Sequence, residues 1–149
     1  MTNLDRDRLD RALIALRRFW TAPDAVPDGA ASVELSTLLV VEAVVEGPTL
    51  PDGEIGVGLV AERLDVRPST ASRLVDRAVG AGVVVKVPSA INGRRANLVL
   101  TPDGTVLARR AREFRGARLD GLLADWSPDD RHALTTLLER LAQAVRSER

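Results

Sequence analysis

The sequence predicts a mainly α-helical protein with one small β-hairpin, and three observations support this fold class. Apolar residues recur at helical spacing along most of the 149 residues. A β-branched run from Val83 to Val87 has a partner from Asn97 to Leu100, and Asn92-Gly93, a strong hairpin signal, lies between them. Two Ser/Thr-Pro-Asp sequences mark helix starts after the hairpin. The hairpin is therefore expected between helical segments.

Two helices are expected before residue 50. The first has an apolar stripe at helical spacing and ends in a loop from Thr21 to Gly29. The second, Val33 to Val45, is apolar almost all round, which predicts burial on several sides. Its valines also fit a strand, but the run is longer than the roughly four to eight residues usual for a strand, so a helix is favoured. The stripe of the first helix consists of Leu9, Leu13, Leu16 and Trp20.

A pair of helices joined by a tight turn follows, which is the arrangement of a helix-turn-helix. The first runs from about Val57 to Leu64, the turn reaches Pro68, and the second helix continues to Ala81. The second helix has two faces at about 100° per residue. Its apolar face is predicted to pack on a core and consists of Ala71, Leu74, Val75, Ala78 and Val79. Its polar face consists of Ser69, Thr70, Ser72, Arg73, Asp76 and Arg77.

The polar face has the chemistry of a DNA recognition helix. Hydroxyls and free N–H groups near a helix start bind phosphate oxygens, and arginines one turn later have the reach to bind guanine. Gly82 is well placed to end the helix, and the hairpin after it carries Arg94 and Arg95 near its tip, as a DNA-binding wing does. The alternative for each arginine is a solvated position or a pairing with a local acid such as Asp76. The order of helix pair, strand, arginine-tipped turn and strand favours DNA binding.

The distribution of charge points to the same segment. The chain has 21 basic and 21 acidic residues, so its net charge alone argues against nucleic acid. Residues 24–62, however, carry eight acids and no base, whereas residues 63–95 carry seven bases and two acids. Positive charge is thus concentrated on the predicted DNA-binding segment.

Two further helices close the sequence, and each start has a capping hydroxyl, a proline and acids in the first turn. The first begins at Thr101-Pro102-Asp103 and is expected to reach about Ala124, and the second begins at Ser127. We expect the stripes of the end helices to pack against a second copy, although packing within one chain is the alternative. The stripes are Leu107, Ala111, Phe114 and Leu122 on the first helix, and Leu134, Leu137, Leu138, Leu141 and Val145 on the second.

Several motifs resemble those of the MarR family of winged-helix transcriptional regulators. They are STASRLVDR at Ser69 to Arg77, the GVV that follows, NGRR in the wing, and LVLTPDG at Leu98 to Gly104. The resemblance is specific over about Leu59 to Leu107, and the flanking helices agree with the family plan. It implies one domain over residues 1–149, with a winged helix-turn-helix at 32–101 and dimerisation helices at 1–22 and 102–149.

The resemblance also implies a function. Such proteins are homodimers that usually repress transcription from a palindromic operator in double-stranded DNA until a small ligand, here an aromatic or anionic one, weakens binding. The recognition helix would read the major groove, and the wing arginines would reach the adjacent minor groove. The predicted DNA contacts are Arg67, Ser69, Thr70, Ser72, Arg73, Arg77, Arg94 and Arg95.

Two residues depart from the family pattern. The wing commonly has an aspartate just before the arginines that fixes one of them by a salt bridge, and Asn92 stands in that place. The residue before Pro68 is often a serine that caps the recognition helix, and here it is Arg67, which loses the cap but adds a candidate phosphate contact. Both changes bear on which bases are read.

Ligand sensing is expected at a crevice between the dimerisation helices and the winged part, as the resemblance implies. Phe19, Trp20 and Phe114 are the candidate liners, with a plain core role as the alternative reading of these aromatic residues. The chain has no cysteine, which excludes a disulfide, a thiol sensor and a cysteine-based zinc site.

The other function classes have weaker support. The one histidine, His132, lies near Asp129 and Asp130, but acids belong at a helix start and no second histidine or cysteine completes a metal set, so we expect no catalysis, metal or cofactor. A winged-helix interaction protein that has lost DNA binding is the alternative function, and the intact arginines argue against it. The charged amino terminus and the lack of a long apolar run predict a cytoplasmic protein without a membrane span.

Overall fold

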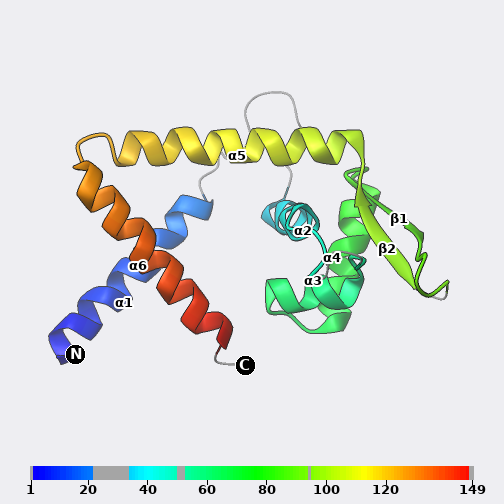
Figure 1. The fold of residues 1–149 in the computed structure, drawn as a ribbon, viewed down its shortest axis with the longest axis horizontal. Helices are drawn as coiled ribbons and strands as arrows, with labels where there is room; N and C mark the ends of the chain where they lie inside the picture. Colours follow the sequence, from blue (N-terminus) through cyan, green and yellow to red (C-terminus); the bar gives the residue numbers. More distant parts are fainter. Residues whose placement is uncertain (1, 22–33, 50–52, 94, 148–149) are drawn as a thin grey trace. The chain divides into compact units, whose positions relative to one another are not determined.

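The computed structural model describes residues 2–21, 34–49, 53–93 and 95–147 (Figure 1). It forms two compact units, residues 1–114 and residues 115–149. Over the described residues the fold is mainly α-helical with one antiparallel hairpin, which confirms the predicted fold class. The elements in order are α1 (Asn3–Thr21), α2 (Leu35–Val45), α3 (Val57–Leu64), α4 (Pro68–Gly80), β1 (Val84–Pro88), β2 (Ala96–Leu100), α5 (Pro102–Leu122) and α6 (Pro128–Ser147).

The core of the first unit lies between α2, α3, α4 and the hairpin. The element α2 is a helix, as favoured over a strand, and it is buried on several sides because apolar residues cover most of its circumference. The first turns of α5 complete this core with Leu107, Ala108 and Ala111. The largest side chains that are fully buried are Val40, Val41, Val60, Val75, Val84 and Leu98.

Backbone geometry at two positions shapes the helix-turn-helix. Asp65 adopts a left-handed φ of 53° after α3, so that the Val66 N–H reaches the Ala61 carbonyl at 3.0 Å. Gly82 has φ 73° after α4, and the Val83 N–H then reaches the Ala78 carbonyl at 3.1 Å. The predicted helix end at Gly82 is confirmed. Both helices thus end sharply, which sets the turn and the start of the hairpin.

The hairpin loop is longer than the Asn-Gly signal suggests. The strands pair from Val84 with Leu100 to Pro88 with Ala96, which leaves seven residues between them. At the tip, the Arg95 N–H donates to the Asn92 carbonyl at 2.8 Å, so Asn92 opens the turn rather than occupying its centre. The strands of the wing are therefore joined by a seven-residue loop that has internal backbone hydrogen bonds, and not by a two-residue turn.

A short segment before α3 lies along β2, which the sequence did not indicate. The Leu98 N–H donates to the Ile55 carbonyl at 2.8 Å, and the Ile55 N–H donates to Asn97 Oδ1 at 2.9 Å. Ile55 itself is buried in the core. The residues that lead into α3 are consequently fixed to the base of the wing.

The helix starts predicted after the hairpin are confirmed. Thr101 Oγ1 accepts from the Gly104 N–H at 3.0 Å and donates to the Gly82 carbonyl at 2.7 Å, so it both caps α5 and ties it to the end of α4. In the second unit, Ser127 Oγ accepts from the Asp130 N–H at 3.1 Å and donates to the Asp130 carboxylate at 2.6 Å. The helix α5 ends two residues before the predicted Ala124.

The end helices leave large apolar side chains in solvent. On α1, Leu4, Leu9, Leu13, Ile14 and Leu16 are exposed, and α6 has no buried residue. Among the described residues, no helix is both long enough and apolar enough to cross a membrane. The apolar faces of α1 and α6 are therefore not covered by a core within their own units.

Gly104 is predicted to be required by packing. It is buried in the first turn of α5, and a Cβ at this position would overlap the carbonyl oxygen of Val83. We expect Gly104→Ala to lower the free energy of unfolding by about 2 kcal/mol or more, measured by urea denaturation. Gly58→Ala, a helical glycine with open space around it, is the control and should change it by about 1 kcal/mol at most. Equal effects of the two substitutions would contradict the close approach.

Candidate nucleic-acid interface

The helix α4 presents the predicted polar face to solvent. Ala71, Val75 and Ala78 are buried against the core, so the opposite side of the helix is turned outward. There Ser69, Arg73 and Arg77 are exposed, and Thr70 and Ser72 are partly exposed. Arg67 precedes the helix and its side chain forms no capping hydrogen bond. In the first turn of α4, Pro68 has no N–H and the Thr70 N–H donates to the Arg67 carbonyl at 2.9 Å, so among the described residues only the Ser69 N–H of this turn is left available to a phosphate.

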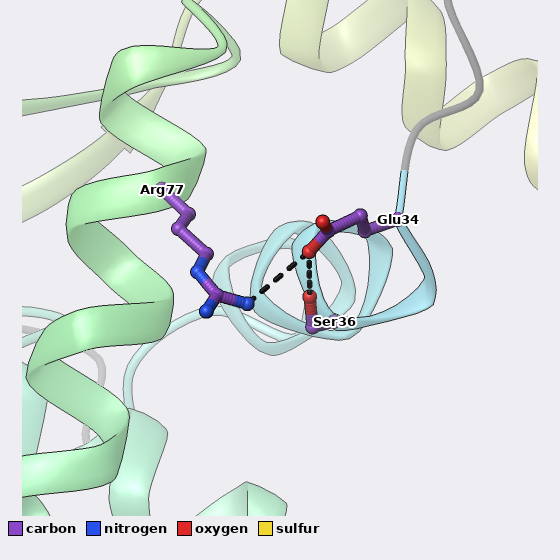
Figure 2. A network of polar contacts seen from close by, with 3 residues as sticks. All are labelled: Glu34, Ser36 and Arg77. Atoms are coloured by element: carbon purple, nitrogen blue, oxygen red, sulfur yellow. Dashed lines mark hydrogen bonds and ion pairs between the residues drawn. The ribbon is translucent and has the colours of Figure 1, made fainter.

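Arg77 is held by an acid that sequence reasoning missed. Its Nη1 atom lies 3.2 Å from Glu34 Oε2, and the hydroxyl of Ser36 donates to the same oxygen at 3.1 Å (Figure 2). Glu34 precedes α2, so this contact joins α4 to the start of α2. The side chains of Arg77 and Glu34 are 61% and 66% exposed, and the ion pair is therefore open to exchange with solvent or DNA.

The one acid on α4, Asp76, pairs with a lysine rather than an arginine. Asp76 Oδ1 lies 2.6 Å from Lys86 Nζ on β1. Asp76 thus pairs with Lys86, and not with a neighbouring arginine as the alternative predicted. Neighbouring residues on α4 thus form exposed ion pairs in two directions, Asp76 with the hairpin and Arg77 with the residue before α2.

Arg63, which also lies in the positively charged segment of residues 63–95, has a structural role. Arg63 on α3 lies 3.2 Å from a carboxylate oxygen of Glu46 and also donates to the Ala43 carbonyl at the end of α2. Its side chain is only 17% exposed, so this arginine is not available to DNA. Arg67, Arg73 and Arg95, in contrast, form no ion pair with any of the described residues. The accessible positive charge is therefore smaller and more localised than the sequence count suggests.

The wing loop is organised around Glu54 and Ser89. The Ala90 N–H donates to Glu54 Oε1 at 2.6 Å, and the Asn92 N–H donates to Ser89 Oγ at 2.8 Å. The pKa of Glu54 is lowered, most by a hydrogen bond from the Ser89 hydroxyl and also by those from the Ala90 and Ile91 N–H groups, which outweigh desolvation. Arg95 is exposed at the end of this loop, and Arg94 lies outside the described residues.

Two pockets of the first unit lined by described residues do not include the predicted ligand residues. One pocket of about 620 Å³ lies between α2, β2 and the start of α5, with Val44, Leu98 and Ala108 in its wall and Arg109 and Arg112 at its edge. The other, of similar volume, lies at the base of the wing. Phe19 on α1 and Phe114 on α5 are partly exposed and line neither, and the Trp20 side chain lies outside the described residues.

No cluster of three metal-binding side chains occurs in the described part of the chain. His132 is exposed on α6. Its neighbour Asp130 accepts the hydrogen bond from the Ser127 hydroxyl. Asp130 thus acts as part of a helix cap, which is the role that its place in the first turn predicts.

Comparison with known proteins agrees with this geometry. No protein-family model and no curated protein matches the chain. Among solved structures, the PcaV transcriptional regulator from Streptomyces coelicolor, in complex with its natural ligand, is 26% identical, with a TM-score of 0.63 over 92% of this chain and 91% of that one. FabT from Streptococcus pneumoniae, in complex with DNA, is 16% identical, with a TM-score of 0.79 over 97% and 99%. A MarR family protein from Bacillus stearothermophilus is 19% identical, with a TM-score of 0.71 over 97% and 98%. The chain thus has the fold of the MarR family of winged-helix transcriptional regulators, the family that its motifs resemble.

Proposed function

We propose that the chain is a homodimeric, sequence-specific DNA-binding regulator that represses transcription from a palindromic operator. The observation that carries the proposal is the outward face of α4, where Arg73 stands in solvent without an ion-pair partner among the described residues beside a helix start that lacks a side-chain cap. A base-reading arginine needs this accessibility, and the Ser69 N–H at the helix start, which has no hydrogen bond to the described residues, can bind a phosphate oxygen. The likeness to FabT in complex with DNA supports it.

The proposed contacts divide into base and backbone contacts. Arg73 lies one turn into α4, where it would bind guanine in the major groove, and the hydroxyls of the first turn would bind phosphate or base edges. Arg67 would bind phosphate, since it precedes the helix and is exposed. The wing arginines would enter the adjacent minor groove. The hydroxyls are those of Ser69, Thr70 and Ser72, and the wing arginines are Arg94 and Arg95.

The apolar faces of the end helices support dimerisation. On α6, Leu137, Leu138, Leu141 and Val145 are between 37% and 61% exposed, although each would gain roughly 1.5–3 kcal/mol from full burial. A second copy would cover them and would place two recognition helices about 34 Å apart, as a palindrome requires. We therefore propose residues 1–22 and 102–149 as the dimerisation helices and residues 32–101 as the DNA-binding part.

A small aromatic or anionic effector is proposed to relieve repression. The pocket between α2, β2 and α5 supports this. Its apolar wall suits the hydrocarbon part of such a ligand, and Arg109 and Arg112 in its lining suit an anionic group. The likeness to PcaV in complex with its natural ligand also supports it. The aromatic residues Phe19, Trp20 and Phe114 remain predicted liners of such a site.

Selection of bound sequences from a random DNA library tests the proposed function. We expect enrichment of a palindrome whose half-sites lie about 10 base pairs apart. An interaction protein that has lost DNA binding would enrich no sequence at low salt, and that outcome would overturn the proposal.

Arg73→Ala should change sequence preference as well as affinity. If Arg73 binds guanine, the substitution should cost about 1–3 kcal/mol on the selected operator and relax preference at one base of each half-site. Arg110→Ala, which removes an exposed arginine from α5, is the control and should leave both unchanged. Equal loss of affinity on operator and random DNA would instead make Arg73 a backbone contact.

Glu34→Gln should strengthen DNA binding. Glu34 competes with phosphate for Arg77, and an exposed ion pair is worth at most about 1 kcal/mol, so we expect a gain of roughly two- to fivefold in affinity on operator and random DNA alike. Glu46→Gln is the matched control, because Glu46 is also 66% exposed but pairs with Arg63 instead of α4. Titration by fluorescence anisotropy measures both variants, and weaker binding by Glu34→Gln would mean that Glu34 orients Arg77 rather than competing for it.

The dimer proposal predicts the effect of charges on the stripe of α6. Leu138→Glu with Leu141→Glu places two carboxylates on the apolar face, and we expect a monomer by analytical ultracentrifugation. Thr136→Glu on the opposite face of α6 is the control and should stay dimeric. A monomeric wild-type chain at micromolar concentration would refute the dimer independently of the variants.

A further inference from the structure

We propose that Glu54 is the positioning residue of the wing. Its carboxylate, which comes from the segment before α3, holds the backbone of the wing loop in place and so sets where Arg95 meets DNA. The role rests on the proposed DNA-binding function and is assigned to a residue that lies well before the hairpin in the sequence. Asn92, in the position where a charged anchor is common, cannot supply this charge.

Glu54 is fixed where it lies. The next residue, Ile55, is buried in the core and is hydrogen-bonded to β2 on both its N–H and its carbonyl, to Asn97 Oδ1 at 2.9 Å and from the Leu98 N–H at 2.8 Å. Since Ile55 is part of the hairpin base, the backbone next to Glu54 is held in place. Little conformational entropy is therefore lost when the Glu54 carboxylate contacts the loop.

The carboxylate binds one continuous stretch of the loop. It accepts a hydrogen bond from the Ala90 N–H at 2.6 Å, and Ser89 and Ile91 also contribute to the lowered pKa of Glu54. Hydrogen bonds to a charged acceptor are stronger than those between neutral groups. Ser89 is itself buried, so its hydroxyl is held between Glu54 and the Asn92 N–H.

The same loop residues carry the arginine. The Ser89 N–H donates to the Arg95 carbonyl at 3.0 Å, and the Arg95 N–H donates to the Asn92 carbonyl at 2.8 Å. Glu54, Ser89, Asn92 and Arg95 also line one pocket at the base of the wing. A displacement of Ser89 would therefore move the peptide units that flank Arg95, which connects Glu54 to the DNA contact.

Charge and position predict opposite effects of removing Glu54. A carboxylate beside a DNA-binding wing repels phosphate, so by charge alone Glu54→Gln should tighten binding. If Glu54 positions the wing, Glu54→Gln should weaken binding, because the amide end turns a donor toward N–H groups. Glu54→Asp also distinguishes the effect of charge from the effect of position, since it keeps the charge but shortens the side chain. By charge alone it should leave binding unchanged, and by position it should weaken binding. The sign of the change thus tells which role Glu54 has.

The first measurement needs no DNA. Amide hydrogen exchange of the full chain should be at least about tenfold faster at Ala90 and Ile91 in Glu54→Gln and Glu54→Asp than in the wild type. Glu46→Gln, which removes a carboxylate away from the wing, should leave these amides unchanged. Unchanged exchange at Ala90 and Ile91 in both Glu54 variants would overturn the tether.

The second measurement uses the selected operator and a double-mutant cycle. We expect Glu54→Gln and Glu54→Asp each to lower affinity roughly five- to tenfold, and to add nothing in a chain that already carries Arg94→Ala and Arg95→Ala. An equal loss in that background would show a general structural effect, and tighter binding would show a purely electrostatic one; either result overturns the positioning role. If the wild type itself binds no DNA, the proposed function fails, whereas the exchange measurement still reports on the tether.

Discussion

The burial of Ala71, Val75 and Ala78 is the constraint on which the rest of the site depends. These small side chains on α4 pack into the core beside α2, so the helix meets solvent with one face only. The interaction is apolar and undirected, and it fixes the face that is exposed without fixing the helix rotation finely. The exposed ion pairs of Asp76 with Lys86 and of Arg77 with Glu34 add contacts of α4 with the hairpin and with the start of α2, each worth at most about 1 kcal/mol.

The positive charge that this chain presents to solvent depends on which basic side chains are exposed and unpaired, and not on its net charge. Arg63, Arg77 and Lys86 each have a carboxylate partner, so the accessible and unpaired cations among the described residues of the winged part are few and lie next to α4 and the wing. If α4 and the wing bind DNA as proposed, few phosphate contacts per chain would give weak non-specific binding. A dimer would double these contacts, and the resulting gain in affinity would matter more for this chain than for a strongly basic protein. The exposed apolar faces of the end helices and the small number of accessible arginines are both consistent with such a dimer.

The sequence predicted whatever depends on neighbours along the chain. Helix faces, the caps at Thr101 and Ser127 and the end at Gly82 follow from residues within about one turn of each other, the hairpin follows from two β-branched or apolar runs around Asn92-Gly93, and the structure confirms them. The contacts it missed join distant residues. Arg77 meets an acid 43 positions away, and Ala90 meets one 36 positions away, and no periodicity or local motif indicates such a pair.

The acidic stretch before the helix-turn-helix gains a physical meaning from these distant contacts. Three of its carboxylates, Glu34, Glu46 and Glu54, hold α4, α3 and the wing respectively. Their charge also bears on Asn92, which lines the same pocket as Glu54. An aspartate at position 92 would place a second carboxylate at the base of the wing, where the two would repel each other and compete for the same N–H groups. A neutral residue at 92 and an acid at 54 are therefore mutually consistent.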